Sequence, residues 1–149
     1  MNEVQVPYLV VGGYALALHG IVRATVDVDI VVSLKEKHLI KVEKVLHDLG
    51  LQSRLPIDAK EIAQFHKEFR VKRNLIAWSF VDFKDPTRQV DILIYPPIRL
   101  LKSEIISVHG TKIRVATKRS LLAMKQAADR PQDQLDIQKL KEALSEKKN

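Results

Sequence analysis

Apolar and polar positions follow two different patterns along this chain. Short apolar runs indicate strands, whose side chains alternate between two faces, and apolar positions spaced three or four residues apart indicate helices. The predicted strands are Tyr8–Val11, Asp27–Val32, a short Leu51–Leu55, Leu75–Phe83, Gln89–Tyr95, Ile105–Val108 and Lys112–Ala116. The predicted helices are Tyr14–His19, Lys35–Leu49, one that opens at Asp58, one from Thr117 to about Asp129, and one from Pro131 to about Glu146. We therefore expect an α+β protein with a mixed β-sheet and helices packed on it.

Turn and cap signals divide these elements. Gly50 ends the second helix, and Asp58 with Glu61 forms a capping-box pattern, although Asp replaces the usual Ser or Thr. Hairpin turns are predicted at Lys84–Thr87 and at Gly110 and Thr111. No repeat, low-complexity segment or linker interrupts the chain, so we expect one domain over residues 1–149. Its core would span 7–95 and its C-terminal helical part about 117–146.

The most informative stretch is 12–32, GGYALALHGIVRATVDVDIVV. Asp27 and Asp29 are two positions apart in a predicted strand, so they share one face, roughly 7 Å apart along the chain. Alternate Val and Ile residues occupy the opposite, buried face. Two neighbouring carboxylates repel each other, and a divalent cation bound by their oxygens relieves that repulsion. The pattern therefore predicts a metal site at this strand.

Gly12 and Gly13 stand where the first strand turns into a helix. Without side chains, they allow backbone N–H groups to approach a phosphate closely. A phosphate-binding turn beside a pair of metal-binding carboxylates indicates phosphoryl or nucleotidyl transfer. The alternative is a buried strand–helix–strand unit in which the acidic residues have no chemical role.

These residues resemble a known group of enzymes. The glycine pair followed by Asp27-x-Asp29 is similar to the nucleotidyltransferase superfamily that includes DNA polymerase beta. The string GGYALALHG-x-x-R-A-T-x-D-V-D resembles the small AbiEii-like toxins and related minimal nucleotidyltransferases. The resemblance implies the nucleotidyltransferase fold, Mg²⁺ or Mn²⁺ as cofactor, a nucleoside triphosphate such as ATP as substrate, and a toxin–antitoxin role.

Composition narrows the remaining possibilities. The chain carries a net charge of +7, which favours a polyanionic partner such as RNA or a triphosphate, although a generally basic surface is the alternative. It has no cysteine, which excludes disulfides, thiolate metal sites and cysteine nucleophiles. No apolar run reaches the length of a membrane span, and the N-terminus lacks signal-peptide features. We therefore expect a cytoplasmic protein with no membrane contact.

Two-metal nucleotidyl transfer requires a third carboxylate on a neighbouring strand. Asp91 lies between Val90 and Ile92 and repeats the pattern of the first pair, and by position it resembles the third aspartate of the superfamily. Asp82 is the rival, but its place near a strand end is typical of a solvated turn residue. The expected metal ligands and catalytic residues are therefore Asp27, Asp29 and Asp91.

The C-terminal helices carry charged residues on apolar stripes. Lys125 shares a helical stripe with leucines, so its amine must reach water or find an anion, and Lys125→Met is expected to leave stability unchanged or slightly raised. Lys125-x-x-Ala128 resembles a motif of the AbiEii-like family, and Asp133 resembles its following aspartate. The resemblance implies that Lys125 binds nucleotide phosphates and that Asp133 supports it. Asp136 is expected at the surface or behind the site.

Two further residues near the acidic strand, Arg23 and His19, have roles that the sequence does not decide. Arg23 is a candidate for phosphate binding, and an ion pair with the strand aspartates is its alternative. The histidines show no metal-ligand spacing, and His19, beside the glycine turn, is expected to be structural. The candidate nucleotide-binding residues are therefore Gly12, Gly13, Arg23, Lys125 and Asp133.

The sequence thus predicts a metal-dependent nucleotidyltransferase. It would transfer a nucleotidyl group from a nucleoside triphosphate to a hydroxyl of RNA, in particular tRNA, or of a partner protein. The main alternative is a non-catalytic module of the same fold that binds nucleotide or RNA. A third possibility is an antitoxin-like component whose work is protein contact.

Overall fold

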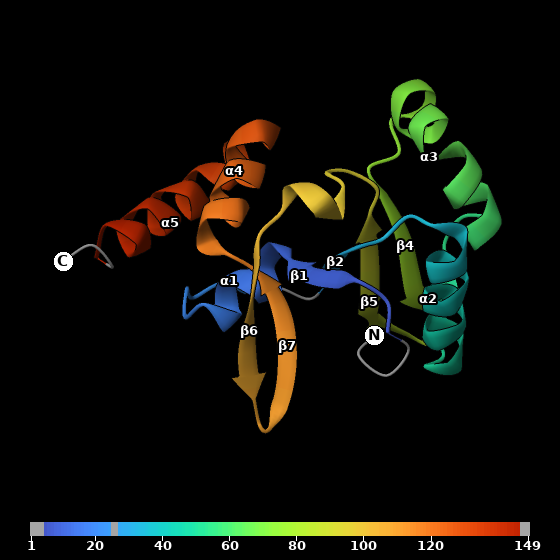
Figure 1. The fold of residues 1–149 in the computed structure, drawn as a ribbon, viewed down its shortest axis with the longest axis horizontal. Helices are drawn as coiled ribbons and strands as arrows, with labels where there is room; N and C mark the ends of the chain where they lie inside the picture. The colour runs from blue at the N-terminus through green and yellow to red at the C-terminus, as the bar shows by residue number, and fades with distance from the viewer. Residues whose placement is uncertain (1–4, 25–26, 147–149) are drawn as a thin grey trace.

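The computed structural model describes residues 5–24 and 27–146; Thr25 of the motif above lies outside them. Strands and helices alternate in the first half of the chain, and two helices end it (Figure 1). The strands are β1 (Tyr8–Val11), β2 (Val28–Val32), β3 (Gln52–Ser53), β4 (Ala77–Asp82), β5 (Asp85–Leu93), β6 (Ser103–Val108) and β7 (Thr111–Ala116). The helices are α1 (Gly12–Leu18), α2 (Glu36–Asp48), α3 (Ala59–Arg73), α4 (Lys118–Ala128) and α5 (Gln134–Glu146), with short 3₁₀ turns η1 (Ile98–Leu100) and η2 (Pro131–Asp133).

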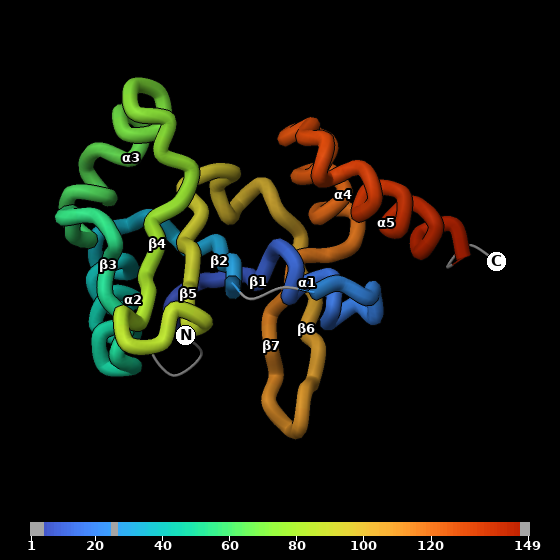
Figure 2. The backbone as a smooth tube through the Cα atoms, turned by 180° about the vertical axis from the view of Figure 1, so that it is seen from behind, coloured from blue at the N-terminus to red at the C-terminus, as the bar shows by residue number. Residues whose placement is uncertain are grey.

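The strands form one mixed sheet in the order β3-β4-β5-β2-β1-β7-β6. The pairs β2–β5 and β1–β7 are parallel and the other pairs are antiparallel. Seen from both sides, α2 and α3 lie at the β4–β5 part of the sheet, and α4 and α5 lie beyond its other half (Figures 1 and 2). This arrangement confirms the predicted α+β class with a mixed sheet and helices packed on it.

The core explains why the acidic strands hold their orientation. Trp78 and Phe80 of β4 are fully buried, with ring centroids 4.6 Å apart in an edge-on contact. Ile30 of β2 and Ile92 of β5 are buried beside them in the same apolar cluster. Because side chains alternate along a strand, burial of these isoleucines turns the residues before them to the opposite face.

Local signals fixed several boundaries as predicted. The capping box at the start of α3 is confirmed, since Glu61 N donates to Asp58 Oδ1 (2.9 Å) and Asp58 N donates to Glu61 Oε1 (3.3 Å). Thr117 caps α4 by accepting from Ser120 N. Gly50 follows α2 with a φ of +86°, a left-handed conformation that glycine adopts without strain.

Other boundaries differ from the predictions. The turn between β4 and β5 lies at residues 83–84 and not at Lys84–Thr87, because Asp82 Oδ1 accepts from Lys84 N and tightens the chain there. Pro86 therefore lies within β5, where β2 has not yet paired with that strand and no N–H is required. Pro131 opens the 3₁₀ turn η2, and α5 begins three residues later. Helix α1 begins directly at Gly12 and not at Tyr14.

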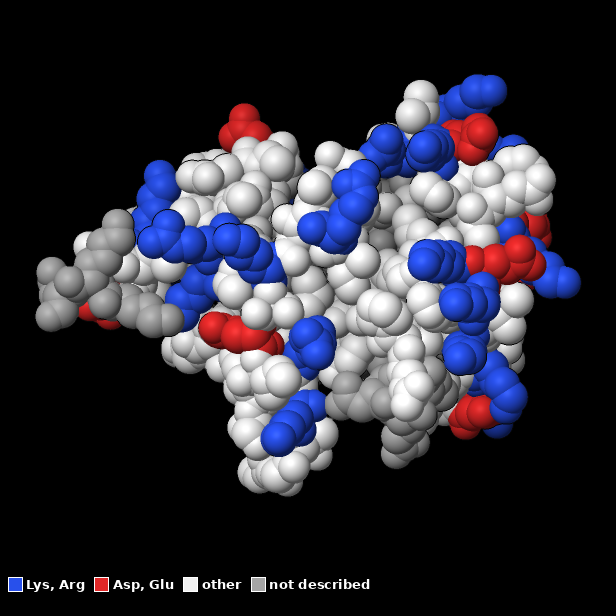
Figure 3. Space-filling view, viewed as in Figure 1, with Lys and Arg blue, Asp and Glu red and all other residues white. Residues whose placement is uncertain are grey.

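Two surface features bear on partners. In residues 5–24 and 27–146, no helix combines the length and apolar character needed to cross a bilayer. On the face drawn in Figure 3, Lys and Arg side chains lie over the α4–α5 pair, at the end of α3 and along α2. On this face the positive charge is therefore spread over several elements and does not form one stripe.

Candidate active site

Asp29 and Asp91 come together at the centre of the sheet. They are paired in register on the parallel neighbours β2 and β5, and both are half-buried. Burial raises the pKa of Asp29 to about 6, and the charge of Asp91, a hydrogen bond with its side chain and the charge of Asp27 act in the same direction. The neighbouring carboxylates repel each other when both are ionised, so Asp29 keeps its proton to a higher pH than a free carboxyl does.

Gly12 lies against this pair. Val11 of β1 is in register with Asp29 on β2, and the next residue, Gly12, has a φ of +70°. A β-carbon at Gly12 would overlap the carboxylate of Asp29. Gly12 is therefore required both by its backbone conformation and by the position of Asp29. Gly13 is buried in the first turn of α1, so both glycines stand where the sequence placed them, while their role toward phosphate stays a prediction.

Asp27 precedes β2 and interacts with the same pair. Burial raises its pKa, the charge of Asp91 raises it further, and the charge of Arg54 opposes both. The three predicted carboxylates thus influence one another electrostatically. No group of three or more His, Asp or Glu side chains is already arranged as a ligand set within the described ranges.

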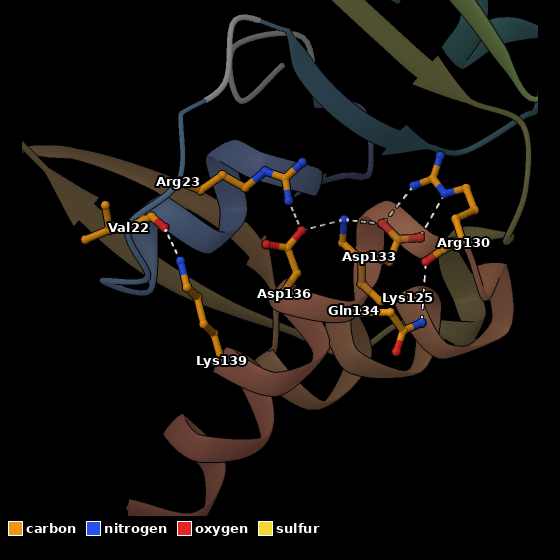
Figure 4. Close-up of polar contacts among 8 residues, drawn as sticks. All are labelled: Val22, Arg23, Lys125, Arg130, Asp133, Gln134, Asp136 and Lys139. Carbon is orange, nitrogen blue, oxygen red and sulfur yellow. Dashed lines mark hydrogen bonds and ion pairs between the residues drawn. The ribbon is translucent and has the colours of Figure 1, made fainter.

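A second polar cluster joins α4, η2 and α5 (Figure 4). Lys125 Nζ lies 3.1 Å from Asp133 Oδ1 and 3.2 Å from Asp136 Oδ2, and Arg130 donates two hydrogen bonds to Asp133, at 2.8 and 3.1 Å. Asp133 and Asp136 are only 1% and 4% exposed. Burial alone would raise the pKa of Asp133, but hydrogen bonds from Arg130 and Lys125 outweigh it and lower that pKa. We call these five residues, including Arg23 below, the α4–α5 ion cluster.

The cations of the ion cluster act on the paired aspartates. The charge of Lys125 opposes the rise in the pKa of Asp29. Hydrogen bonding to Asp133 raises the pKa of Arg130, and the charge of Asp29 contributes to that rise. Lys125 of α4 and Arg130, which follows it, therefore bring positive charge to Asp29 of β2, although they lie far from it in the sequence.

Arg23 has a partner that the sequence did not predict, while its role toward phosphate stays a prediction. It forms an ion pair with Asp136 of α5, and Lys139 Nζ donates to the neighbouring Val22 O at 3.1 Å (Figure 4). The loop before β2 is thus fastened to α5. Asp136 was expected at the surface or behind the site. The surface position is wrong, because Asp136 is buried between Arg23 and Lys125, and the position behind the site remains.

The rival third carboxylate lies elsewhere. Asp82 accepts from Lys84 N and pairs with Arg88 at 2.8 Å, and its pKa is lowered first by the backbone hydrogen bond from Lys84. Across the β4–β5 pair, the residue opposite Asp91 is Ser79. Asp82 is thus a turn residue, and the geometry brings Asp91 to Asp29.

His19 has a structural environment. Its Nε2 lies 2.8 Å from Ala116 O, and its Nδ1 lies 3.2 Å from a carboxylate oxygen of Glu104. These contacts join the end of α1 to the β6–β7 hairpin, on the side of α1 away from its glycine turn. The expectation that His19 is structural therefore agrees with its contacts.

Three polar residues of this region were missed by sequence reasoning. Gln89 Nε2 donates to Asp91 Oδ1 at 2.9 Å, and Arg54 donates to Gln89 Oε1 at 2.9 Å. Gln89 could have been found, because it stands two positions before Asp91 and so shares its face of the strand. Arg54 and Arg130 lie in connecting segments, where no periodicity indicates what their side chains contact.

Comparison with protein-family models and with curated proteins found no match for this chain. The chemistry of the site must therefore be argued from its residues and their geometry. These are two paired carboxylates and a third nearby, a glycine turn against them, and the positive charges of Lys125 and Arg130, which act on Asp29.

Proposed function

We propose that this protein is a metal-dependent nucleotidyltransferase of the polymerase-beta-like superfamily. The observation that supports the proposal most directly is the register of Asp29 and Asp91 on adjacent parallel strands, against a glycine turn at Gly12. A half-buried pair of neighbouring carboxylates costs free energy unless something compensates for it. A site that binds cations and a triphosphate explains why such a pair lies near the positive charge of Lys125, which is mostly buried, and of Arg130, which is partly exposed.

The donor chemistry of the site fits a divalent metal. Asp27, Asp29 and Asp91 provide carboxylate oxygens, the ligands that Mg²⁺ and Mn²⁺ prefer. A proton held on Asp29 would be released when a cation binds, because metal ligands must be ionised. When bound, such ions would supply Lewis-acid stabilisation of the transferring phosphoryl group and activation of the attacking hydroxyl.

Residues of the chain would hold the triphosphate in position for attack on its α-phosphorus. Lys125 and Arg130 provide positive charge for its phosphates, and backbone N–H groups at Gly12 and Gly13 provide neutral donors. Asp133 holds both cations by direct contact, so neither is free to rotate away. The acceptor oxygen would bond to the α-phosphorus as the bond to the pyrophosphate oxygen breaks, and the hydroxyl proton would leave to solvent or a neighbouring base.

The acceptor is proposed to be a hydroxyl of RNA, in particular tRNA, or of a partner protein in a toxin–antitoxin pair. The net charge of +7 supports a polyanionic partner, since basic surfaces attract phosphate backbones at a distance. The lysines and arginines over α4, α5 and the end of α3 contribute to that attraction (Figure 3).

The test is transfer of label from each α-³²P-labelled nucleoside triphosphate to total RNA or a candidate partner protein, in Mg²⁺ or Mn²⁺. We expect labelled product with the wild type and none with Asp27→Asn or Asp29→Asn, both of which should fold. Undiminished transfer by either variant would contradict the proposed mechanism. Tight triphosphate or RNA binding without transfer would instead support the alternative, a non-catalytic binding module.

A further inference from the structure

Asp91 on β5 is held by a chain of polar contacts that begins beside β3, two strands away. Arg54 follows β3, and its backbone N donates to Ser79 O of β4 at 2.9 Å. Ser79 lies opposite Asp91, which lies opposite Asp29. The backbone therefore places Arg54 level with the paired carboxylates, at the far side of β4 and β5.

The side chains complete this connection. Arg54 donates to Gln89 Oε1, and Gln89 Nε2 donates to Asp91 Oδ1, both at 2.9 Å. A guanidinium has only donors, so the amide oxygen of Gln89 must face Arg54 and its NH₂ group must face Asp91. With the amide reversed, its oxygen would face a carboxylate and both contacts would be repulsive. Arg54 thus selects the orientation in which Gln89 can donate to Asp91.

We propose that Gln89 and Arg54 are positioning residues for Asp91, with Gln89 fixing the carboxylate directly and Arg54 fixing the amide of Gln89. The inference rests on the proposed function of Asp29 and Asp91 as cation ligands. With Oδ1 of Asp91 engaged by Gln89, the carboxylate cannot rotate freely. Partners of this kind commonly set the orientation and affinity of metal-binding carboxylates.

Arg54 also carries a positive charge, so the direction in which its removal changes cation affinity tests the proposal. Its positive charge acts on Asp27, so removal of that charge alone should strengthen cation binding. Removal of its hold on Gln89 should weaken cation binding, because Asp91 loses its fixed donor. The two roles of Arg54 therefore predict opposite changes in affinity.

The experiment is an electron paramagnetic resonance titration with Mn²⁺ alone, at low ionic strength, in which the signal of free Mn²⁺ gives the dissociation constant. The variants are Gln89→Met, Arg54→Met and the double variant, which remove the amide, the guanidinium or both. Asp91→Asn reports whether Asp91 is a ligand at all. Arg88→Met is the matched control, since Arg88 pairs with Asp82 and contacts Leu49 O instead of the carboxylate pair.

We expect Gln89→Met to weaken Mn²⁺ binding about tenfold. Arg54→Met should weaken binding in the wild-type background and strengthen it or leave it unchanged in the Gln89→Met background. Arg88→Met should leave Mn²⁺ affinity unchanged, and melting curves should show that every variant is folded at the titration temperature.

The outcomes that contradict the positioning role differ from those that contradict the cation site. If Asp91→Asn weakens binding but Gln89→Met does not, the positioning role is wrong while the cation site stands. If Arg54→Met strengthens binding in both backgrounds, Arg54 acts only as a charge and the proposed hold on Gln89 is wrong. If the wild type binds no Mn²⁺, or Asp91→Asn changes nothing, the proposed cation site fails and the positioning role fails with it.

Discussion

Gly12 and Asp29 lie so close together that a β-carbon at position 12 would overlap the carboxylate of Asp29. The two residues meet because Val11 and Asp29 are in register on the antiparallel pair β1–β2. The glycine turn and the acidic strand are therefore one structural unit. A change at Gly12 should be detected at Asp29.

Gly12→Ala should destabilise the protein for two reasons, a left-handed backbone and the overlap with Asp29. Gly20→Ala is the matched control, because Gly20 also has a positive φ (+83°) but a β-carbon there would meet nothing within 4 Å. We expect Gly20→Ala to cost about 1 kcal/mol and Gly12→Ala about 2–4 kcal/mol in the free energy of unfolding by urea. Equal costs would mean that Asp29 moves aside without penalty.

Asp29 should make stability depend on pH in an unusual direction. Its pKa is raised from 3.8 to about 6, so the folded state holds this proton more tightly than the unfolded chain does. The stability that this proton contributes is fully present below about pH 4 and is lost as pH rises through 6. Asp29→Asn does not titrate, so relative to the wild type it should gain about 1–2 kcal/mol between pH 4.5 and 7.5, after a discount for partial exposure.

Asp82→Asn provides the opposite sign for the same measurement. The backbone N–H of Lys84, with Arg88, lowers the pKa of Asp82, so the ionised carboxylate stabilises the fold above the unfolded-state pKa. Relative to wild type, Asp82→Asn should therefore be less stable at pH 7.5 than at pH 4.5. The stability of Asp29→Asn relative to wild type should change in the opposite direction between these two pH values. Urea unfolding at the two pH values measures both. A constant difference between Asp29→Asn and wild type would show that folding does not raise the pKa of Asp29.

The elements that the sequence predicted well are those with purely local causes. Alternation of Val and Ile around the aspartates predicted β2 and the last part of β5, and the Asp58–Glu61 capping box predicted the start of α3. The pairing of Asp29 with Asp91 depends on strand order. No local pattern specifies which strands become neighbours, although the repeated motif and the family resemblance pointed to Asp91.

The role of Lys125 required the tertiary structure. On a helical stripe, a lysine that reaches water and one that meets a buried acid give the same pattern. Asp133 and Asp136 meet Lys125 only because η2 turns the chain back, so that α5 packs on α4. Arg54 lies about 35 residues before its partner Gln89. Their contact could not be predicted, because it depends on the pairing of β3 with β4 in the sheet.

Asp91→Asn should reduce nucleotidyl transfer far more than Asp82→Asn. Asp91 shares a hydrogen bond with Asp29, whereas Asp82 is engaged by its own turn and by Arg88. At saturating Mg²⁺ we expect a loss of about a hundredfold or more in the rate for Asp91→Asn and less than about threefold for Asp82→Asn. The reverse ranking would mean that Asp82 is the third ligand.

Lys125→Met tests the α4–α5 ion cluster, and its expected effect on stability differs from the one that the sequence indicated. Lys125 is 12% exposed and contacts two carboxylates that are almost fully buried, so loss of its charge leaves Asp133 and Asp136 with fewer partners. Breaking a buried ion pair from one side typically costs about 3–5 kcal/mol. Because Arg130 and Arg23 remain as partners, we expect a smaller loss, about 2–3 kcal/mol.

Lys44→Met is the matched control, since Lys44 also pairs with an aspartate but both side chains are largely exposed. Such a surface pair contributes about 0.5 kcal/mol or less, so Lys44→Met should hardly change the free energy of unfolding. Asp136→Asn should recover part of the loss in the Lys125→Met background, because it removes one of the two carboxylates left behind. Equal stability of Lys125→Met and Lys44→Met would show that the buried acids do not depend on Lys125.

Nucleotide affinity separates the binding role of Lys125 from its structural role. At a temperature where Lys125→Met is fully folded, calorimetric titration with a non-hydrolysable triphosphate and Mg²⁺ should show a loss of affinity of roughly ten- to a hundredfold. Lys125→Arg keeps the charge and the contact with Asp133, so its affinity should stay within about threefold of the wild type. If Lys125→Met is destabilised but binds triphosphate as tightly as the wild type, Lys125 serves only to neutralise Asp133 and Asp136. The positive charge facing the phosphates would then come from Arg130, whose guanidinium already lies close enough for its pKa to respond to Asp29.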